Sequence, residues 1–244
     1  MKTTSHISFK RLLAAGLGVS LLSLSLAACD AAPTSTASGE DQMPTIGIIQ
    51  YAVHSSLDNC YNGLIQGLEE AGYTDGETCV IDFKNAQGNT TTADQIANNM
   101  AAKNYDMIVG IATPAAMSAY GAAKEKIPVV FCAVSDPMAE NAKLVQSLEK
   151  TGVNCTGSSD RLNLEGQLQM IRAFQPDAKK IGILYNTAEA NSASNLAEIK
   201  KLAPSYGFEI VEKGVQSAAD IPTAANSLVS QVDCINNFTD NLVV

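Results

Sequence analysis

Segments with strand character and segments with helix character alternate along the chain from Thr45 onward, and this alternation restricts the fold more than any other feature. The apolar run "TIGIIQY" at 45–51 has the composition of a buried strand. The next segment ends at Gly72 and has helical spacing of its apolar residues, which are Leu57, Tyr61, Leu64, Ile65 and Leu68. Because such alternation forms parallel sheets with right-handed crossovers, we expect a doubly wound α/β fold.

The alternation predicts two lobes, one at 45–157 and one at 158–244. In the first lobe we expect further strands at 78–86, 106–112, 127–134 and 152–157, and helices at 91–105, 114–126 and 136–150. In the second we expect helices at 160–176, 192–207 and 218–231, and strands at 179–186, 208–215 and 232–238. The second lobe repeats the Ile-Gly-Ile strand of the first, but three strands make a thin sheet. We therefore expect it to be truncated at the C-terminus relative to a complete two-lobe fold.

The first 44 residues have the pattern of an export signal followed by a tether. A basic start is followed by the uncharged apolar run 12–26 and then by Leu-Ala-Ala-Cys, which matches the bacterial lipobox and ends at Cys29. We expect a lipoprotein signal peptide at 1–28, acylation of Cys29, and a flexible polar tether at 29–44. The protein would then be exported and anchored through its acyl chains to the outer face of the bacterial cytoplasmic membrane.

Composition excludes several classes of function. The formal net charge of −9 argues against a nucleic-acid partner. His6 lies in the signal peptide, so His54 is the one histidine of the mature chain, and neither metal-ligand spacing nor a phosphate-binding or nucleophile motif occurs. We expect no cofactor, no metal and no catalytic residue. The cysteines after Cys29 are odd in number, and we interpret Cys79, Cys132, Cys155 and Cys234 as small buried residues, with one disulfide possible.

The joint "GIATPAAMSAY" at 110–120 offers a candidate ligand site. Thr113 suits the N-cap of a helix and Pro114 its first turn, which would leave the amides of Ala115 and Ala116 free to bind an anion. Ligands of open α/β sheets bind at the carboxyl ends of the strands. Carboxylates on other loops of that edge would face the amides, and we expect the site to bind a zwitterion such as an α-amino acid; these carboxylates are Asp136, Glu189 and Asp240.

Several blocks together resemble one protein family. "IVGIATPAA", "IPVVFCAVSDP", "KIGILYNTAEANS" and "VDCINNFTDN" are similar, in order, to the substrate-binding lipoproteins of ABC importers of the tryptophan/tyrosine-uptake type. The resemblance implies a type I periplasmic-binding-protein fold without catalytic activity, closing about a hinge over a small ligand. It places these residues in the ligand loops: Tyr51, His54, Asp58, Thr113, Pro114, Ala115, Ser135, Asp136, Asn186, Glu189, Asn191, Ser192, Thr239, Asp240 and Asn241.

Two features depart from the family pattern. "INNF" replaces a smoother apolar strand that ends in proline, and family members continue past Thr-Asp-Asn with further strands and helices. The resemblance predicts a lipid-anchored solute-binding component of an ABC importer, with an amino acid, aromatic in side chain, as ligand and the permease subunits and the membrane as partners. Two alternatives remain: a surface-attached ligand sensor or non-transport receptor, and an enzyme on a flavodoxin-like scaffold.

Overall fold

The computed structural model describes residues 43–244, in which parallel strands alternate with helices as the sequence predicts. The predicted signal peptide at 1–28, the acylation site Cys29 and nearly all of the predicted tether at 29–44 lie outside the described residues. The described part forms two parallel sheets, which define two lobes.

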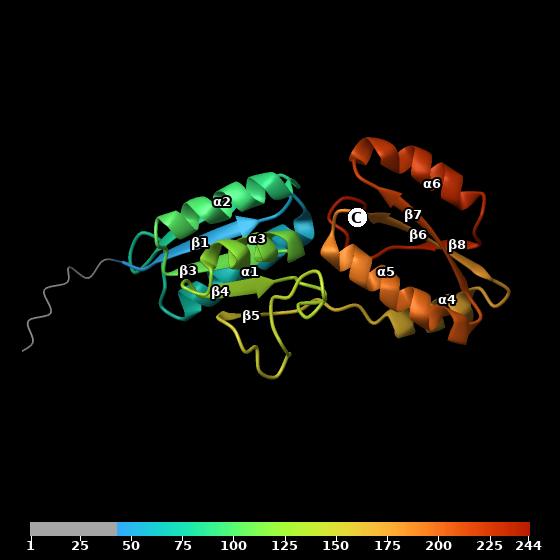
Figure 1. Cartoon of the computed structure of the whole chain (residues 1–244), viewed down its shortest axis with the longest axis horizontal. Helices are drawn as coiled ribbons and strands as arrows, with labels where there is room; N and C mark the ends of the chain where they lie inside the picture. Colours follow the sequence, from blue (N-terminus) through green and yellow to red (C-terminus); the bar gives the residue numbers. More distant parts are fainter. Residues whose placement is uncertain (1–42) are drawn as a thin grey trace, which may run out of the picture. The chain divides into compact units, whose positions relative to one another are not determined.

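The first lobe is built on a five-stranded parallel sheet with the strand order β2-β1-β3-β4-β5 (Figure 1). The chain runs from β1 to β2 on one side and then to β3 on the other, so the order reverses between β1 and β3. Ligands of open α/β sheets bind outside the carboxyl ends of strands at such a reversal. The elements of this lobe are β1 (Thr45–Gln50), α1 (Ser55–Glu70), β2 (Val80–Asn85), α2 (Thr90–Ala102), β3 (Met107–Ile111), α3 (Thr113–Ala123), β4 (Val129–Cys132) and β5 (Cys155–Gly157).

The second lobe has a three-stranded parallel sheet with the order β7-β6-β8, so its strand order reverses between β6 and β8. The predicted lobe boundary at 157/158 falls directly after β5 of the first sheet, and residues 158–163 form a connecting segment. The elements that follow it are α4 (Leu164–Phe174), β6 (Lys180–Asn186), α5 (Ala190–Leu202), a 3-10 turn (Ala203–Tyr206), β7 (Glu209–Val215), a 3-10 turn (Ala218–Asp220), α6 (Ile221–Val229) and β8 (Cys234–Asn236).

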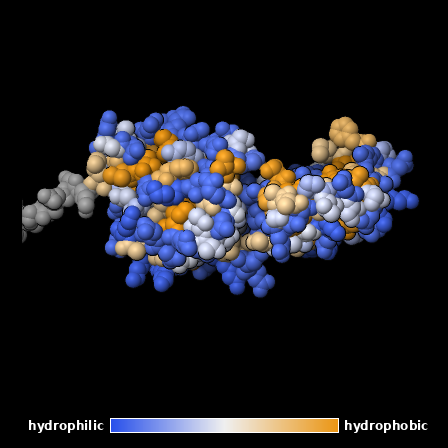
Figure 2. All heavy atoms as spheres, turned by 90° about the horizontal axis from the view of Figure 1, so that it is seen from above, coloured by the Kyte–Doolittle hydropathy of each residue, from blue (hydrophilic) through white to orange (hydrophobic). Residues whose placement is uncertain are grey.

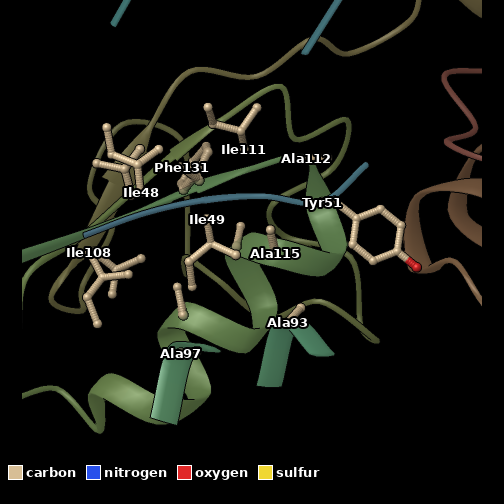
Figure 3. Close-up of a cluster of buried hydrophobic side chains, with 14 of the residues drawn as sticks. Ile48, Ile49, Tyr51, Ala93, Ala97, Ile108, Ile111, Ala112, Ala115 and Phe131 are labelled. Carbon is tan, nitrogen blue, oxygen red and sulfur yellow. The ribbon is translucent and has the colours of Figure 1, made fainter. Parts of the chain in front are cut away.

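The core of the first lobe explains why its central strands are apolar on both faces. Ile48 and Ile49 are both fully buried, although alternate side chains of a strand point to opposite faces. Figure 3 shows Ile49 beside Ala97 of α2 and Ala115 of α3, where the small side chains allow the helices to approach the sheet closely. Each buried isoleucine contributes about 1.5–3 kcal/mol. A strand buried on both faces reads as a continuous apolar run, which is the signal that identified β1.

The Ile-Gly-Ile repeat of the two lobes has one structural cause. A Cβ atom at Gly47 of β1 would lie 2.6 Å from the sulfur of Met100, and one at Gly182 of β6 would lie 2.9 Å from side-chain atoms of Leu228. Met100 belongs to α2 and Leu228 to α6, so in each lobe a helix side chain occupies the space that the glycine leaves. The repeat therefore marks where a helix crosses the first strand of each sheet.

Most predicted elements are confirmed, but the helix predicted at 136–150 is wrong. This segment forms turns, in which the amides of Leu144 and Val145 both donate to the carbonyl of Pro137 at 2.9 and 3.2 Å. Lys143 has a φ of 48°, which reverses the chain, and the Leu144 side chain is fully buried. The apolar residues of this segment thus fill the core from a compact loop, and their spacing imitates that of a helix.

The surface is mixed in character, and the cysteines are unpaired in the described part of the chain. On the face that Figure 2 shows, hydrophobic residues occur in small groups among hydrophilic ones. No helix within residues 43–244 is long and apolar enough to cross a bilayer. All five cysteines of this part are free; Cys79 and Cys155 are buried as predicted, while Cys60, Cys132 and Cys234 are partly buried.

Candidate ligand-binding site

A cavity of about 330 Å³ is lined by loops at the carboxyl ends of strands in both sheets and by the first turns of the helices that follow them. Its volume falls in the range of small-molecule sites. The connecting segment contributes Asp160 and the second lobe contributes Asn191, Thr239, Asp240, Asn241 and Val244. The first lobe contributes His54, Ser56, Leu57, Cys60, Thr113, Ala133 and Ser135.

The start of α3 differs from the predicted anion site. The N-cap is Ala112, with φ 78° and ψ 154°, rather than Thr113, and no side chain caps this helix. The Ala116 amide donates to the Ala112 carbonyl at 3.0 Å, and Thr113, Pro114, Ala115 and Ala116 are all buried. The predicted free amide at Ala116 is therefore wrong, and the whole turn is buried rather than open to a ligand. The sheet packs so closely against α3, at Gly110, that this turn faces the core, and Thr113 alone of these residues lines the cavity.

Two buried carboxylates of the second lobe are fully engaged within that lobe. Asp240 accepts hydrogen bonds from the Asn186 amide (2.7 Å), the Ser192 hydroxyl (2.6 Å) and the amides of residues 242 and 243 (both 2.9 Å). Glu189 accepts bonds from the side-chain amides of Asn186 (3.1 Å), Asn191 (3.1 Å) and Asn241 (2.6 Å). This network joins the loop after β6 to the loop after β8.

The same network shifts the pKa of Glu189. Burial raises the pKa of the Glu189 carboxyl, and the neighbouring Asp240 charge raises it further, while hydrogen bonds from Asn241 and Asn191 oppose the rise. Because their oxygens are already occupied, neither carboxylate is the free acceptor for an amino group that the sequence led us to expect. Both position the loops that line the cavity.

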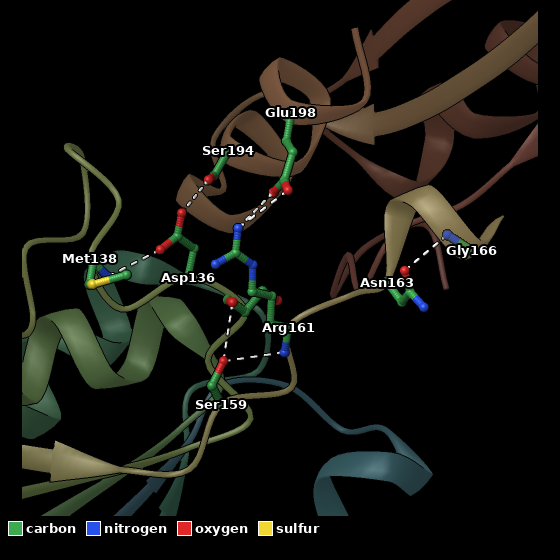
Figure 4. A network of polar contacts seen from close by, with 9 residues as sticks. Asp136, Met138, Ser159, Arg161, Asn163, Gly166, Ser194 and Glu198 are labelled. Atoms are coloured by element: carbon green, nitrogen blue, oxygen red, sulfur yellow. Dashed lines mark hydrogen bonds and ion pairs between the residues drawn. The ribbon is translucent and has the colours of Figure 1, made fainter. Parts of the chain in front are cut away.

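Asp136 lies outside the cavity and joins the two lobes. Its carboxylate accepts a hydrogen bond from the Ser194 hydroxyl of α5 at 2.8 Å and one from the Met138 amide at 3.2 Å (Figure 4). Beside it, Arg161 of the connecting segment forms an ion pair with Glu198 of α5 at 3.3 Å. Asp136 therefore lies at a contact between the lobes and not in the cavity wall, where we expected it to contact the ligand.

A model of the family described as ABC transporter substrate binding protein matches residues 45–244. The chain belongs to this family. Members are solute-binding proteins, so the enzyme alternative is not supported, and the two parallel sheets agree with the type I periplasmic-binding-protein-like architecture that the resemblance implied.

Individual relatives support the family membership. The chain is 39% identical over 239 residues to the tyrosine-binding protein of Clostridioides difficile, which covers 96% of this chain and 67% of that protein. A Streptococcus pneumoniae ABC domain, solved in complex with L-Trp, is 36% identical with a TM-score of 0.78 and covers 83% of this chain and 67% of the other. The ligand-free, open structure of a substrate-binding protein with adhesive properties from Clostridium difficile is 40% identical with a TM-score of 0.59, at 82% and 67% coverage.

The residues that the family resemblance placed in the ligand loops divide into two groups. Seven of them line the cavity: His54, Thr113, Ser135, Asn191, Thr239, Asp240 and Asn241. The other eight do not line it: Tyr51, Asp58, Pro114, Ala115, Asp136, Asn186, Glu189 and Ser192.

Residues of the second group support the loops that carry the first group. The Tyr51 hydroxyl donates to the Gly88 carbonyl at 3.0 Å, and Asp58 accepts a bond from the buried Gln50 side chain at 2.8 Å. Burial is the main cause that raises the pKa of the Tyr51 phenol. These two polar side chains thus hold the loop after β1 in place. A family motif alone does not distinguish residues with this role from residues that contact the ligand.

Several lining residues of this family member were missed by sequence reasoning. Asp160 follows two serines in "TGSSD", where the pattern is that of a capping loop, and Cys60 lies on the apolar stripe of a helix. Leu57 and Ala133 also line the cavity. One feature of the sequence could have identified Asp160 as a lining residue: it follows the strand β5 closely, at the same edge of the sheet as Thr113.

Proposed function

We propose that this protein binds an aromatic α-amino acid in the cavity described above and delivers it to the permease of an ABC importer. The observation that carries the proposal is the mixed lining of that cavity. The Thr113 hydroxyl group and the mutually hydrogen-bonded hydroxyl groups of Ser135 and Thr239 lie on its wall. The apolar side chains of Leu57 and Cys60 lie on the same wall. Hydroxyl groups donate to a carboxylate, and an apolar wall suits an uncharged side chain.

The relatives support the ligand class. One relative is a tyrosine-binding protein, and another was solved with L-Trp bound. Both are more than 35% identical to this chain over most of its described length. An aromatic amino acid presents a carboxylate, which the hydroxyl groups suit, and an apolar ring, which the apolar wall suits, and it also carries an ammonium group. In this proposal the hydroxyl groups, rather than the amides of α3, bind the carboxylate of the ligand.

A thermal-shift screen of purified protein against the twenty amino acids tests the ligand class. Ligand at about 100 times its Kd stabilises a protein by about 2.7 kcal/mol, which is a readily measured rise in Tm. We expect L-tyrosine or L-tryptophan to give the largest rise, and isothermal titration calorimetry to confirm it. A cooperative melting curve that no amino acid shifts would contradict the proposal.

We further propose that the protein is exported and acylated at Cys29, which holds it on the outer face of the bacterial cytoplasmic membrane. The support is the Leu-Ala-Ala-Cys motif after an uncharged apolar run. Wild-type protein expressed in a bacterium should then fractionate with membranes and incorporate labelled palmitate. A Cys29→Ser variant should not incorporate palmitate, and labelling that survives this substitution would exclude Cys29 as the acylation site.

The transport role is tested separately in cells. Deletion of the gene should lower uptake of labelled tyrosine or tryptophan, and expression of the protein in trans should restore uptake. Unchanged uptake, together with ligand binding in vitro, would favour the sensor or non-transport receptor alternative over the importer component.

A further inference from the structure

Buried polar atoms without a hydrogen-bond partner are rare in folded proteins. Among the described residues, four buried side-chain atoms have none: Gln50 Oε1, Asp160 Oδ1, Asn191 Oδ1 and Asn195 Nδ2. Two of these residues, Asp160 and Asn191, line the ligand cavity. Both of their unpartnered atoms are oxygens, so two residues of the cavity lining each have a buried acceptor for which the described residues supply no donor.

The orientation of the Asn191 amide is fixed by its neighbours. Its Nδ2 donates to Glu189 Oε2 at 3.1 Å and to the Thr239 carbonyl at 2.7 Å. The opposite orientation would place the amide oxygen against these two acceptors, which is unfavourable. Oδ1 is therefore the free atom, and Asn191 is only 2% exposed, so bulk water does not satisfy it.

Asp160 is the carboxylate in the cavity wall that has an unoccupied oxygen. Asp240 also lines the cavity, but four donors occupy its oxygens. Asp160 is held against the first lobe, since its amide donates to the Val134 carbonyl at 3.3 Å. Asn191, in contrast, belongs to the first turn of α5 in the second lobe. The two free acceptors are thus supplied by different parts of the fold.

We propose that Asp160 Oδ1 and Asn191 Oδ1 together bind the ammonium group of the ligand and thereby select amino acids over aromatic acids that lack an amino group. An ammonium group carries three donors and a positive charge, so it can satisfy both oxygens and offset the charge of the partly buried Asp160 carboxylate. A water molecule supplies donors but no charge. This inference rests on the proposed function and specifies which residues recognise the ligand's charged group.

The experiment compares three probes on wild-type protein by calorimetry: L-tyrosine, its analogue without the amino group, 3-(4-hydroxyphenyl)propanoate, and its analogue without the carboxylate, tyramine. L-tryptophan, indole-3-propanoate and tryptamine form a second series. We expect the deaminated analogues to bind at least about 30-fold more weakly than the amino acids, which corresponds to about 2 kcal/mol. An analogue without the amino group that binds as tightly as its amino acid would overturn the proposal.

The protein side is tested with Asp160→Asn, which keeps the size of the side chain and removes its charge. We expect amino-acid affinity to fall at least about 30-fold, with the affinity for the deaminated analogue unchanged or improved. The matched control is Asp177→Asn, which makes the same change in net charge at an exposed position. A cooperative melting curve for each variant ensures that folded protein is compared.

The outcomes separate this inference from the proposed function. If the wild-type protein binds an amino acid and Asp160→Asn binds it equally well, the ammonium assignment is wrong and the proposed function stands. If no amino acid binds to folded wild-type protein, both are wrong. If both variants lose affinity alike, long-range charge rather than contact at Asp160 accounts for the loss, and the assignment is again wrong.

Discussion

The Asp136 carboxylate and the Ser194 hydroxyl lie 2.8 Å apart and join the loop after β4 to helix α5. A second hydrogen bond, 2.7 Å between the hydroxyl groups of Ser135 and Thr239, joins the loop after β4 to the loop after β8. Both bonds connect the two lobes, and the Ser135–Thr239 pair also lines the ligand cavity. Ligand affinity should therefore depend on contacts that the ligand itself does not make.

Ser194→Ala removes the donor of the first of these bonds without altering the cavity wall. A hydrogen bond to a charged group contributes about 1.5–3 kcal/mol, and less where it is partly exposed as here, so we expect the Kd for the amino-acid ligand to rise about three- to tenfold. Calorimetry on the variant measures this. Ser205→Ala, at an exposed position of the second lobe, serves as the control, and equal Kd values for the two variants would show that the bond does not stabilise the liganded state.

Ligand affinity should decrease at acidic pH. Burial raises the pKa of the Asp160 carboxyl above its usual value, although the Ser135 side chain opposes this by a hydrogen bond. Only the ionised carboxylate attracts an ammonium group, so affinity should be constant at neutral pH and decrease as pH falls through the raised pKa, by up to tenfold per pH unit. Titration calorimetry between about pH 4.5 and 8 follows this change.

Other titratable groups near Asp160 define the control for that pH profile. His54, Cys60 and Asp240 line the same cavity, and burial together with the Cys132 thiol and the Asp160 charge raises the pKa of Cys60 to about 11. Asp160→Asn retains all three groups. The affinity of this variant, although lower, should not decrease further as the pH falls. If wild type and variant lose affinity equally on acidification, a group other than Asp160 causes the pH dependence.

Asp240→Asn should destabilise the second lobe. The carboxylate accepts four hydrogen bonds from buried or partly buried donors, and an amide would turn its own donors toward two of them. We expect the free energy of unfolding to decrease by roughly 2–4 kcal/mol. Urea denaturation measures this, with Asp177→Asn as the control. An unchanged midpoint, with weaker ligand binding, would instead restore Asp240 as a direct ligand contact.

Gly110→Ala tests how closely α3 packs on the sheet. A Cβ atom at Gly110 of β3 would overlap the backbone of Ala116, whereas one at Gly121 of α3 would meet nothing within 4 Å. Overpacking against backbone costs about 1–3 kcal/mol, and a glycine-to-alanine change at an open helix position adds about 0.5–1 kcal/mol of stability. Thermal unfolding should therefore move in opposite directions for Gly110→Ala and Gly121→Ala. A shift of the same sign in both would refute the packing argument.

The sequence by itself determined the class and order of nearly all elements. Strands such as β1 and β6 are buried on both faces, so their apolar runs are visible without knowledge of their neighbours, and the Ile-Gly-Ile repeat marks the same strand in each lobe. The family blocks likewise located the loops at the strand ends. The segment 136–150 was mistaken for a helix because a compact loop that buries Leu144 has the same apolar spacing.

The tertiary structure alone decided which loop residues face the ligand cavity and which hold the loops in place. Glu189 and Asp160 are both acidic residues after strands, yet Glu189 is enclosed by asparagine side chains, while Asp160 lines the cavity and keeps one oxygen without a partner. Ala115 and Thr113 are neighbours in one turn, but only Thr113 reaches the cavity. The difference depends on hydrogen bonds between residues about fifty positions apart, and no local pattern encodes such pairs.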